Sequence, residues 1–274
     1  MNKLMETFLK NGGIAHNANG EFANQSVVLL GGFVEDFKPV LEQLEAQDLK
    51  DREVFLLHPL RFNPYGFKHF FYEVGAEEAV VALLAYGLSA FKNPPLKDFT
   101  KTLDVGYLSS ECNFAEEELE EIIQSYQKNG LLIFVGKDLQ IHKEGENIAR
   151  ILAMLSHLER VKIVFLESYC TKLPLNMEAM KPLSALESYD GLVVYLQEDS
   201  KRCGILEASK QFCLVSKMQE NAEIKVRFED SKREIRAKLQ CNTALKGMVG
   251  ILWIPREMQY DGFCYKLVEI TKVA

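Results

Sequence analysis

The sequence predicts a mixed α/β protein, in which helices flank a mostly parallel sheet and a smaller β-rich domain follows at the C-terminal end. Over the first 200 residues, short apolar runs alternate with segments of helical period, which indicates strands joined by helical crossovers. Beyond residue 200, apolar and polar residues alternate one by one, as in strands with one face exposed to water. We therefore predict an α/β domain over residues 1–200 and a β-rich domain over residues 201–274.

Five mostly apolar runs are predicted to form the parallel sheet. A short run without regular polar alternation is typical of a strand that is buried on both faces. The run Leu131–Val135 is the clearest, because it is uniformly apolar and Gly136 closes it. The other predicted strands lie at residues 26–30, 54–57, 161–166 and 192–196.

The predicted helices carry apolar residues at spacings of three and four. They cover residues 37–44, 76–91, 115–128 and 146–158. The second of these is the most apolar part of the chain, but it contains Glu77 and Glu78 and falls short of the roughly 20 residues of a membrane span. We interpret it as a core helix. Asn113 is the predicted N-cap of the third helix, and Asn93-Pro94-Pro95 predicts a long turn.

The β-rich domain begins with a predicted hairpin. Ile224, Val226 and Phe228 alternate with charged residues, and the alternation resumes after residue 232. Two further apolar segments, at residues 249–254 and 263–273, predict the remaining strands.

The charge balance bears on partners and location. The chain has 39 acidic and 32 basic residues and a formal net charge of −7. Nucleic-acid-binding proteins carry a basic excess or a basic stripe, so we exclude nucleic acid as a partner. The first ten residues carry three charges, and no continuous apolar run follows them, which does not fit a signal peptide. The sequence predicts a cytoplasmic protein that does not itself enter the membrane.

The six cysteines and five histidines form no metal-ligand pattern. No two cysteines have the C-x-x-C spacing, and no two histidines have a spacing that places both rings on one face of a helix or strand. The G-x-S-x-G turn of a serine nucleophile is also missing. We therefore predict free, mostly buried thiols, no metal, no cofactor and no catalytic residue.

Two turns are candidate anion-binding sites. Gly31 and Gly32 lie between a predicted strand and a helix, where a parallel sheet commonly binds phosphate. The full glycine-rich fingerprints are missing, and Glu35 and Asp36 would repel an anion, so a tight turn with acidic helix capping is the alternative. Lys137 follows the strand at residues 131–135 and offers a cation at its carboxyl end; the alternative is a solvated loop lysine.

Two stretches carry a family resemblance. They are Tyr72–Leu84 (YEVGAEEAVVALL) and Phe134–Leu152, with FVGKDL at its start, His142, and ENIARIL at its end. Both resemble the molybdopterin-oxidoreductase-like region of the large iron–sulfur subunit of respiratory complex I (NADH-quinone oxidoreductase). Ala244–Gly250 (ALKGMVG) resembles, more weakly, the β segment that closes that subunit.

The resemblance implies an α/β body with a terminal β domain, and a role as a subunit of the complex I peripheral arm. The clustered cysteines of the large subunit are missing, so no cluster ligand can be carried over. In complex I this fold has generally lost its pterin and acts as scaffold, and some bacterial complexes carry shorter, divergent subunits in place of the NADH-oxidising module. The expected partners are other complex I subunits, especially the large iron–sulfur subunit, with membrane association at the inner face only through the complex. The alternative is a stand-alone α/β enzyme that binds a small anionic or nucleotide ligand at Gly31, Gly32 or Lys137.

Overall fold

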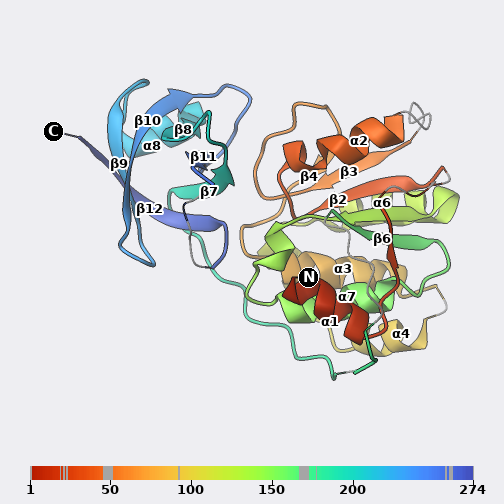
Figure 1. The fold of residues 1–274 in the computed structure, drawn as a ribbon. Helices are drawn as coiled ribbons and strands as arrows, with labels where there is room; N and C mark the ends of the chain where they lie inside the picture. Colours follow the sequence, from red (N-terminus) through yellow and green to blue (C-terminus); the bar gives the residue numbers. More distant parts are fainter. Residues whose placement is uncertain are drawn as a thin grey trace. The chain divides into compact units, whose positions relative to one another are not determined.

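A computed structural model describes residues 2–18, 20, 22, 24–45, 52–91, 93–166, 173–176, 178–256, 258 and 262–273. The chain divides into two compact units (Figure 1). The α/β unit comprises Met1–Pro59 and Gly66–Glu187, and the barrel unit comprises Leu60–Tyr65 and Ser188–Ala274. The division of the main chain therefore falls between Glu187 and Ser188 rather than at residue 200.

The α/β unit contains a six-stranded sheet with the strand order β1-β6-β5-β2-β3-β4, and every neighbouring pair is parallel. The strands are β1 (Ala15–His16), β2 (Ser26–Leu30), β3 (Val54–Leu57), β4 (Lys68–Phe70), β5 (Leu131–Val135) and β6 (Val161–Phe165). All residues of β2 and β5 are buried, as expected for central strands covered on both faces. The predicted strands at 26–30, 54–57, 131–135 and 161–166 are confirmed.

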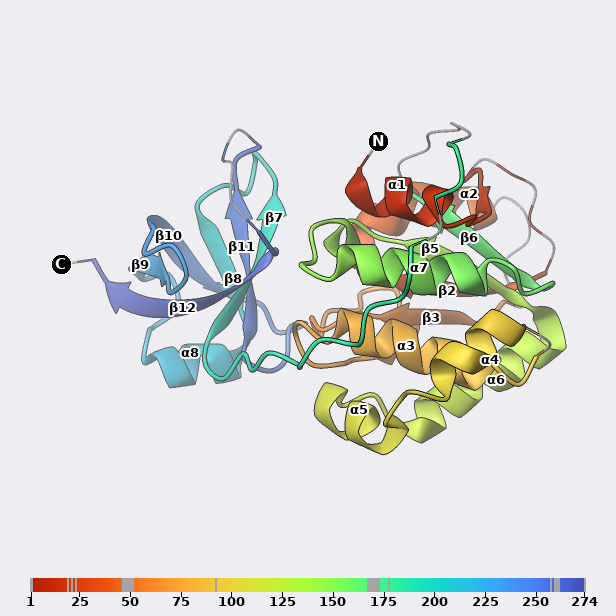
Figure 2. The ribbon, with the colours of Figure 1, turned by 90° about the horizontal axis from the view of Figure 1, so that it is seen from below.

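Helices lie on both faces of this sheet (Figure 1), and Figure 2 shows the face covered by α3 and α7. They are α1 (Lys3–Lys10), α2 (Lys38–Glu45), α3 (Glu77–Leu88), α4 (Pro94–Thr100), α5 (Val105–Cys112), α6 (Glu116–Asn129) and α7 (Gly145–Leu155), with short 3₁₀ turns η1 (Val34–Phe37) and η3 (Asp138–Gln140). In Figure 1, α2 lies on the opposite side of the sheet from α3 and α7. Its apolar residues Val40, Leu41 and Leu44 are buried, so its amphipathic stripe faces the sheet.

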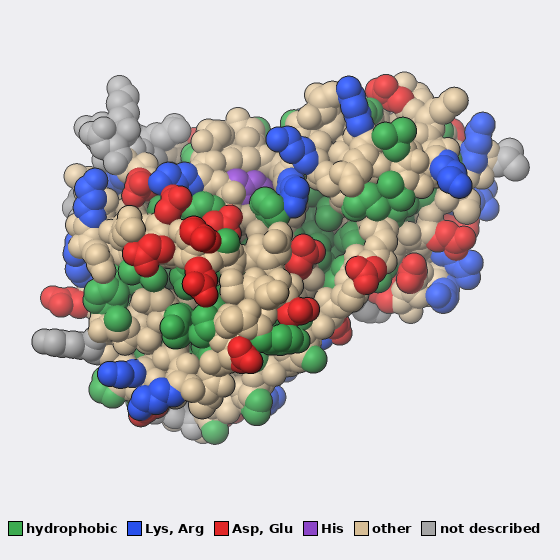
Figure 3. All heavy atoms as spheres, turned by 180° about the vertical axis from the view of Figure 1, so that it is seen from behind, with side chains coloured by type: hydrophobic (Ala, Val, Ile, Leu, Met, Phe, Trp, Pro, Cys, Tyr) green, Lys and Arg blue, Asp and Glu red, His purple; other side chains and the backbone are tan. Residues whose placement is uncertain are grey.

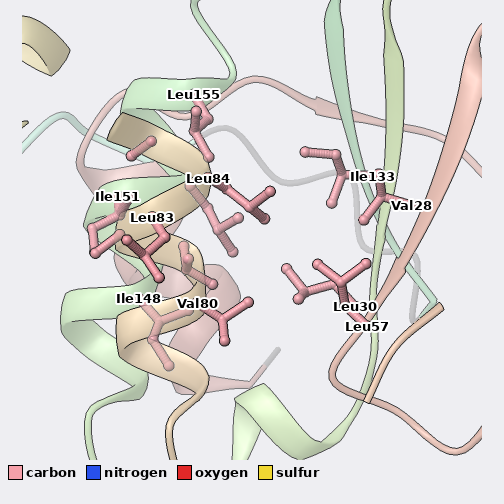
Figure 4. Packing of buried hydrophobic residues seen from close by; sticks show 14 of the residues in the cluster. Val28, Leu30, Leu57, Val80, Leu83, Leu84, Ile133, Ile148, Ile151 and Leu155 are labelled. Atoms are coloured by element: carbon pink, nitrogen blue, oxygen red, sulfur yellow. The ribbon is translucent and has the colours of Figure 1, made fainter. Parts of the chain in front are cut away.

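The main core lies between the sheet and the pair α3 and α7 (Figure 4). Its side chains are aliphatic and fully buried, and they come from Val28, Leu30, Leu57 and Ile133 of the sheet, Val80, Leu83 and Leu84 of α3, and Ile148, Ile151 and Leu155 of α7. Each such side chain contributes roughly 1.5–3 kcal/mol of transfer free energy. The core explains why Ala76–Phe91 is so apolar: α3 is buried on nearly its whole circumference.

The barrel unit is a closed six-stranded barrel with the order β10-β8-β11-β7-β12-β9. Its strands are β7 (Val193–Glu198), β8 (Ile205–Ala208), β9 (Glu223–Phe228), β10 (Glu234–Cys241), β11 (Val249–Ile254) and β12 (Tyr265–Lys272), and one helix, α8 (Lys210–Ser216), follows β8. The pairs β10–β8 and β11–β7 are parallel, and the other pairs are antiparallel. The predicted β9–β10 hairpin is confirmed.

The predicted position of one strand is wrong. The sequence pattern predicts residues 192–196 as a strand of the parallel sheet, but Val193–Glu198 forms β7 of the barrel. The first five residues of β7 are buried, because its inner face packs in the barrel core and its outer face is also covered. The sequence signature of such a strand matches that of a central strand in an α/β sheet.

Two local predictions are also wrong. Asn93-Pro94-Pro95 starts a helix instead of a long turn: the Asn93 side chain accepts a hydrogen bond from the Leu96 amide at 3.2 Å, and the prolines occupy the first helical positions, where proline is tolerated. Asn113 is not the N-cap of α6, since that position is Ala115. Asn113 instead ends α5 in the left-handed conformation, with φ of 54°, which asparagine adopts more readily than most residues.

Candidate functional site

The carboxyl edge of the parallel sheet is the candidate site. From β2 the chain adds β3 and β4 on one side, and it then returns to add β5 and β6 on the other side of β2. The carboxyl ends of β2 and β5 therefore flank the switch point of the sheet, where ligands commonly bind in open α/β folds. Gly31 and Gly32 follow β2, and Gly136 and Lys137 follow β5, so the structure brings the two predicted turns side by side.

The two turns are in direct backbone contact. The Gly136 amide donates to the Leu30 carbonyl at 2.8 Å, and the Asp138 amide donates to the Gly31 carbonyl at 3.0 Å. A Cβ on Gly136 would lie 2.3 Å from the Gly31 oxygen, and a Cβ on Gly31 would lie 2.5 Å from Leu139 Cγ. Gly31 also has a positive φ of 60°. Close packing and backbone conformation thus require glycine at both positions.

Lys137 faces an acidic residue of the neighbouring turn. Its Nζ lies 3.1 Å from Asp36 Oδ2, and both side chains are partly exposed. The carboxylate offsets part of the lysine charge that an incoming anion would meet. Binding of an anion by Gly31, Gly32 and Lys137 stays a prediction.

A buried histidine–carboxylate pair lies at the same edge. His58 follows β3, and its Nε2 lies 3.0 Å from Asp138 Oδ2. Both side chains are almost completely buried, with 2% and 1% of their surface exposed. The His69 ring of β4 is hydrogen-bonded to the His58 carbonyl at 3.1 Å. Sequence reasoning missed this pair, because His58 and Asp138 are distant in the chain and share no motif; only the strand order brings them together.

A second buried polar group lies where α3 begins. His142 Nε2 lies 3.3 Å from Glu77 Oε2 and 3.4 Å from the Gly75 carbonyl. The Glu144 amide donates to His142 Nδ1 at 3.1 Å, which places the ring proton of neutral His142 on Nε2, toward the acceptors. Burial lowers the pKa of His142, but the Glu77 carboxylate and the Gly75 carbonyl raise it by more, so the net shift is upward.

Glu78 and Asn147 form a third buried polar pair, next to the start of α3. The Asn147 amide nitrogen donates to Glu78 Oε1 at 2.5 Å and to the Lys181 carbonyl at 3.1 Å, while the Lys181 amide donates to Asn147 Oδ1 at 3.2 Å. The Ser184 amide donates to Glu78 Oε2 at 3.0 Å. Burial raises the pKa of Glu78, and these hydrogen bonds oppose the rise.

These contacts hold residues 178–187, which we call the connector, against α3 and α7 (Figure 2). Arg150 of α7 adds an ion pair to Glu178, and Lys143 pairs with Glu187 at 2.6 Å. The connector has no helix or strand of its own, and side chains of the α/β unit bond the backbone groups of Glu178, Lys181 and Ser184.

A groove of about 800 Å³ lies between the connector and the helices α4 and α5. Its walls are mainly apolar, and residues contributing to them include Phe99, Leu103, Tyr107, Met154, Met180 and Leu183. Tyr107 is 49% exposed. Volume and lining fall in the range of sites that take an apolar group of another molecule. On one face of the molecule, Figure 3 shows Asp and Glu side chains gathered among apolar patches.

Within the part of the chain that the structure describes, no group of three or more His, Cys, Asp or Glu side chains is arranged to hold a metal ion. Among the same residues, none of the helices combines the length and the apolar character needed to cross a membrane. No protein-family model matches the sequence, and no curated protein matches it.

Proposed function

We propose that this chain is a non-catalytic subunit of a complex I (NADH-quinone oxidoreductase) peripheral arm. In this role it packs against iron–sulfur subunits, especially the large one, and supports electron input without a redox centre of its own. It associates with the inner face of the membrane only through the complex. The redox chemistry belongs to the cofactors of its partners, and this chain contributes spacing and exclusion of water.

The observation that carries the proposal is that the two stretches with the resemblance form one packed unit. The first stretch supplies most of α3, including Glu77 and Glu78. The second supplies the end of β5, η3 and most of α7, including Asn147, and His142 lies between η3 and α7. The Glu77–His142 and Glu78–Asn147 contacts join them in the interior. Short similarities that are far apart in the sequence but adjacent in the fold favour a common architecture over two unrelated coincidences.

The order of the two units also supports the proposal. An α/β unit with a parallel sheet is followed by a separate six-stranded barrel, and the resemblance implies an α/β body with a terminal β domain. The weakly similar segment Ala244–Gly250 lies in the barrel unit and leads into β11.

The apolar groove supplies a contact surface for such a partner. A subunit that is stable only in an assembly exposes more contiguous apolar surface than a monomer does. Tyr107 is the exposed aromatic residue of the groove, and aromatic side chains are enriched among the residues that dominate binding at interfaces.

Affinity purification from the native organism tests the proposal. An epitope tag on the full chain, followed by mild detergent extraction of membranes, is expected to recover complex I subunits, with the large iron–sulfur subunit among them. The purified chain on its own is expected to be colourless, without iron or flavin. Recovery without any complex I subunit, or a tightly bound flavin or nucleotide, would contradict the proposal and favour the stand-alone enzyme.

A pair of tyrosine variants locates the contact. Tyr107→Glu places a charge in the groove and is expected to reduce recovery of the partner subunits at least severalfold. Tyr86→Glu is the matched control, since Tyr86 is exposed to a similar extent, 44% against 49%, and lies outside the groove. Equal recovery of the partner subunits with both variants would show that the groove is not part of the interface. Whether the chain assembles with complex I at all is decided separately by the purification of the tagged parent chain.

A further inference from the structure

Two cysteines of the barrel unit are neighbours in space although they lie far apart in the sequence. Cys213 belongs to α8, and Cys241 is the last residue of β10. The Cys213 thiol is hydrogen-bonded to the Cys241 sulfur. Neither cysteine is in a disulfide bond, and both are only partly buried. Neither cysteine belongs to the candidate site, the connector contacts or the groove.

The barrel topology fixes this proximity. Cys241 pairs with Ala208, the last residue of the parallel strand β8, and the Asn242 amide donates to the Ala208 carbonyl at 2.9 Å. Directly after Ala208 the chain turns into α8, whose N-cap Ser209 accepts from the Phe212 amide at 3.0 Å. The N-terminal end of α8 therefore lies next to the C-terminal end of β10.

The side-chain directions agree with the contact. Along β10, Ala237 and Leu239 point into the barrel core. Because side chains alternate along a strand, Cys241 points to the same face. Cys213 packs against the same core from α8, next to the fully buried Phe212. Each sulfur is thus held by regular structure on its own side of the contact.

We propose that Cys213 and Cys241 are a redox modification site that closes to a disulfide when the protein meets a peroxide or a small-molecule disulfide. The pKa of the Cys213 thiol is raised by burial and by its neighbour, so we assign Cys213 as the resolving thiol and Cys241 as the sulfur that attacks first. The partial exposure of both residues admits a small oxidant, whereas Cys112 and Cys264 are buried.

The chemistry balances with either oxidant. With hydrogen peroxide, the Cys241 thiolate attacks one oxygen, the O–O bond breaks, and water and a sulfenic acid form. The Cys213 sulfur then displaces the oxygen as a second water, and the S–S bond forms. With glutathione disulfide, Cys241 displaces one glutathione thiol and Cys213 displaces the other. In both cases the two cysteines lose two protons and two electrons, which the oxidant accepts.

The pH dependence of the reaction follows from the environment of Cys213. Burial, together with the neighbouring Cys241, raises the pKa of the Cys213 thiol. Since the thiolate is the reactive form, closure is expected to be slow near neutral pH and faster in mildly alkaline buffer. Oxidation of the isolated chain is therefore best followed over a pH series.

Mass spectrometry of the full chain tests the proposal. The reduced protein is treated with glutathione disulfide, alkylated and digested, with Cys170→Ser as the background because Cys170 lies outside the described residues. The expected product is a peptide pair joined through Cys213 and Cys241, and the joined pair disappears in Cys213→Ser and in Cys241→Ser. Cys203 is exposed and serves as the control: Cys203→Ser leaves the joined pair unchanged.

A thermal melt gives a second reading that does not depend on the variants. The disulfide would close the loop that contains the β9–β10 hairpin, so oxidation is expected to raise the melting temperature reported by the fluorescence of Trp253, and a reductant is expected to restore it. The proposal is overturned if Cys203 takes up glutathione while the joined pair stays absent across the pH series. A Cys213 or Cys241 joined only to another cysteine overturns it as well.

Discussion

Asn147 of α7 and Glu78 of α3 share a hydrogen bond of 2.5 Å inside the α/β unit, and the same asparagine bonds both backbone groups of Lys181. Asn147 is 1% exposed. One buried side chain therefore ties two core helices to the connector.

Asn147→Ala is expected to lower the free energy of unfolding by about 2–4 kcal/mol, because it leaves the Glu78 carboxylate and the Lys181 backbone groups buried without this partner. Urea unfolding followed by circular dichroism measures the change. Gln124→Ala, at an exposed position of α6, is the control and is expected to stay within about 0.5 kcal/mol of the parent. A similar small effect for Asn147→Ala would show that the connector is not held by this side chain.

Glu53 gives a pH-dependent contribution to stability. The Ser125 hydroxyl donates to its carboxylate at 2.6 Å and lowers the pKa of Glu53, burial opposes this, and Lys68 at 3.1 Å lowers it further. The net pKa lies below the ordinary value of 4.5. A lowered carboxyl pKa stabilises the folded state above the unfolded value, and this contribution is lost as the pH falls through the folded value.

Glu53→Gln is therefore expected to destabilise the protein at neutral pH and to make its stability less sensitive to acid below pH 4.5. Unfolding free energies measured from pH 7 down to about pH 3 check this sign. Glu117→Gln, at an exposed position of α6, is the comparison. Identical slopes for the parent and Glu53→Gln in the acid range would contradict the assignment.

Two glycine-to-alanine changes are expected to have opposite effects on the stability of the folded protein. Gly31→Ala puts a Cβ 2.5 Å from Leu139 Cγ at a positive φ, and both effects destabilise, by about 2–4 kcal/mol together. Gly106→Ala lies on an exposed face of α5, where the nearest atom to a Cβ is 3.9 Å away, so it should stabilise by about 0.5–1 kcal/mol. Thermal melts of the two variants compare them directly. Because Leu139→Ala also removes a buried core side chain, the double variant Gly31→Ala/Leu139→Ala is expected to lose less stability than the sum of the two single losses. An unchanged melting temperature in Gly31→Ala would mean that the two turns can move apart.

The single tryptophan of the chain reports on the barrel unit. The Arg202 guanidinium lies 3.3 Å from the centre of the Trp253 ring, and the indole nitrogen of Trp253 donates to Glu207 Oε1 at 2.7 Å. Arg202→Ala is expected to lower the free energy of unfolding by about 1–2 kcal/mol and to change the Trp253 emission maximum, because the cation over the ring is lost. Arg202→Lys should recover only part of this, because lysine lacks the planar guanidinium. Denaturation followed by Trp253 fluorescence provides the measurement. Arg236→Ala, at an exposed position of β10, is the control and is expected to have the same free energy of unfolding and emission maximum as the parent.

The sequence predicts the elements of the α/β unit best where burial leaves a single interpretation. Leu131–Val135 has the predicted limits of β5, because a uniformly apolar run closed by glycine fits little else. The same reasoning fails for β7, since a barrel strand covered on both faces is apolar for a different reason. Asn113 shows the limit for caps: an asparagine between two helices suits the end of the first as well as the start of the second, and only the left-handed backbone of Asn113 decides.

The site was predictable only turn by turn. The position of Gly31 and of Lys137 after strands follows from the local pattern, but their proximity depends on the order of β2 and β5 in the sheet. His58–Asp138 and Cys213–Cys241 have no local signal at all, because each pair is created by strand pairing between distant segments. The packing of Leu139 against Gly31 likewise depends on side-chain directions that periodicity does not specify.

Leu60–Tyr65 leaves the α/β unit and belongs to the barrel unit, where Arg61 forms a β-bridge with Lys246. The polypeptide consequently passes between the two units three times, and no single cleavage of the chain yields both as uninterrupted fragments. An expressed fragment that stops at Glu187 would retain a six-residue piece of the other unit, and its complement would lack that piece. Separation would instead require replacing Leu60–Tyr65 with a short linker that rejoins Pro59 to Gly66, and supplying the excised hexapeptide to the barrel as a fused or added strand.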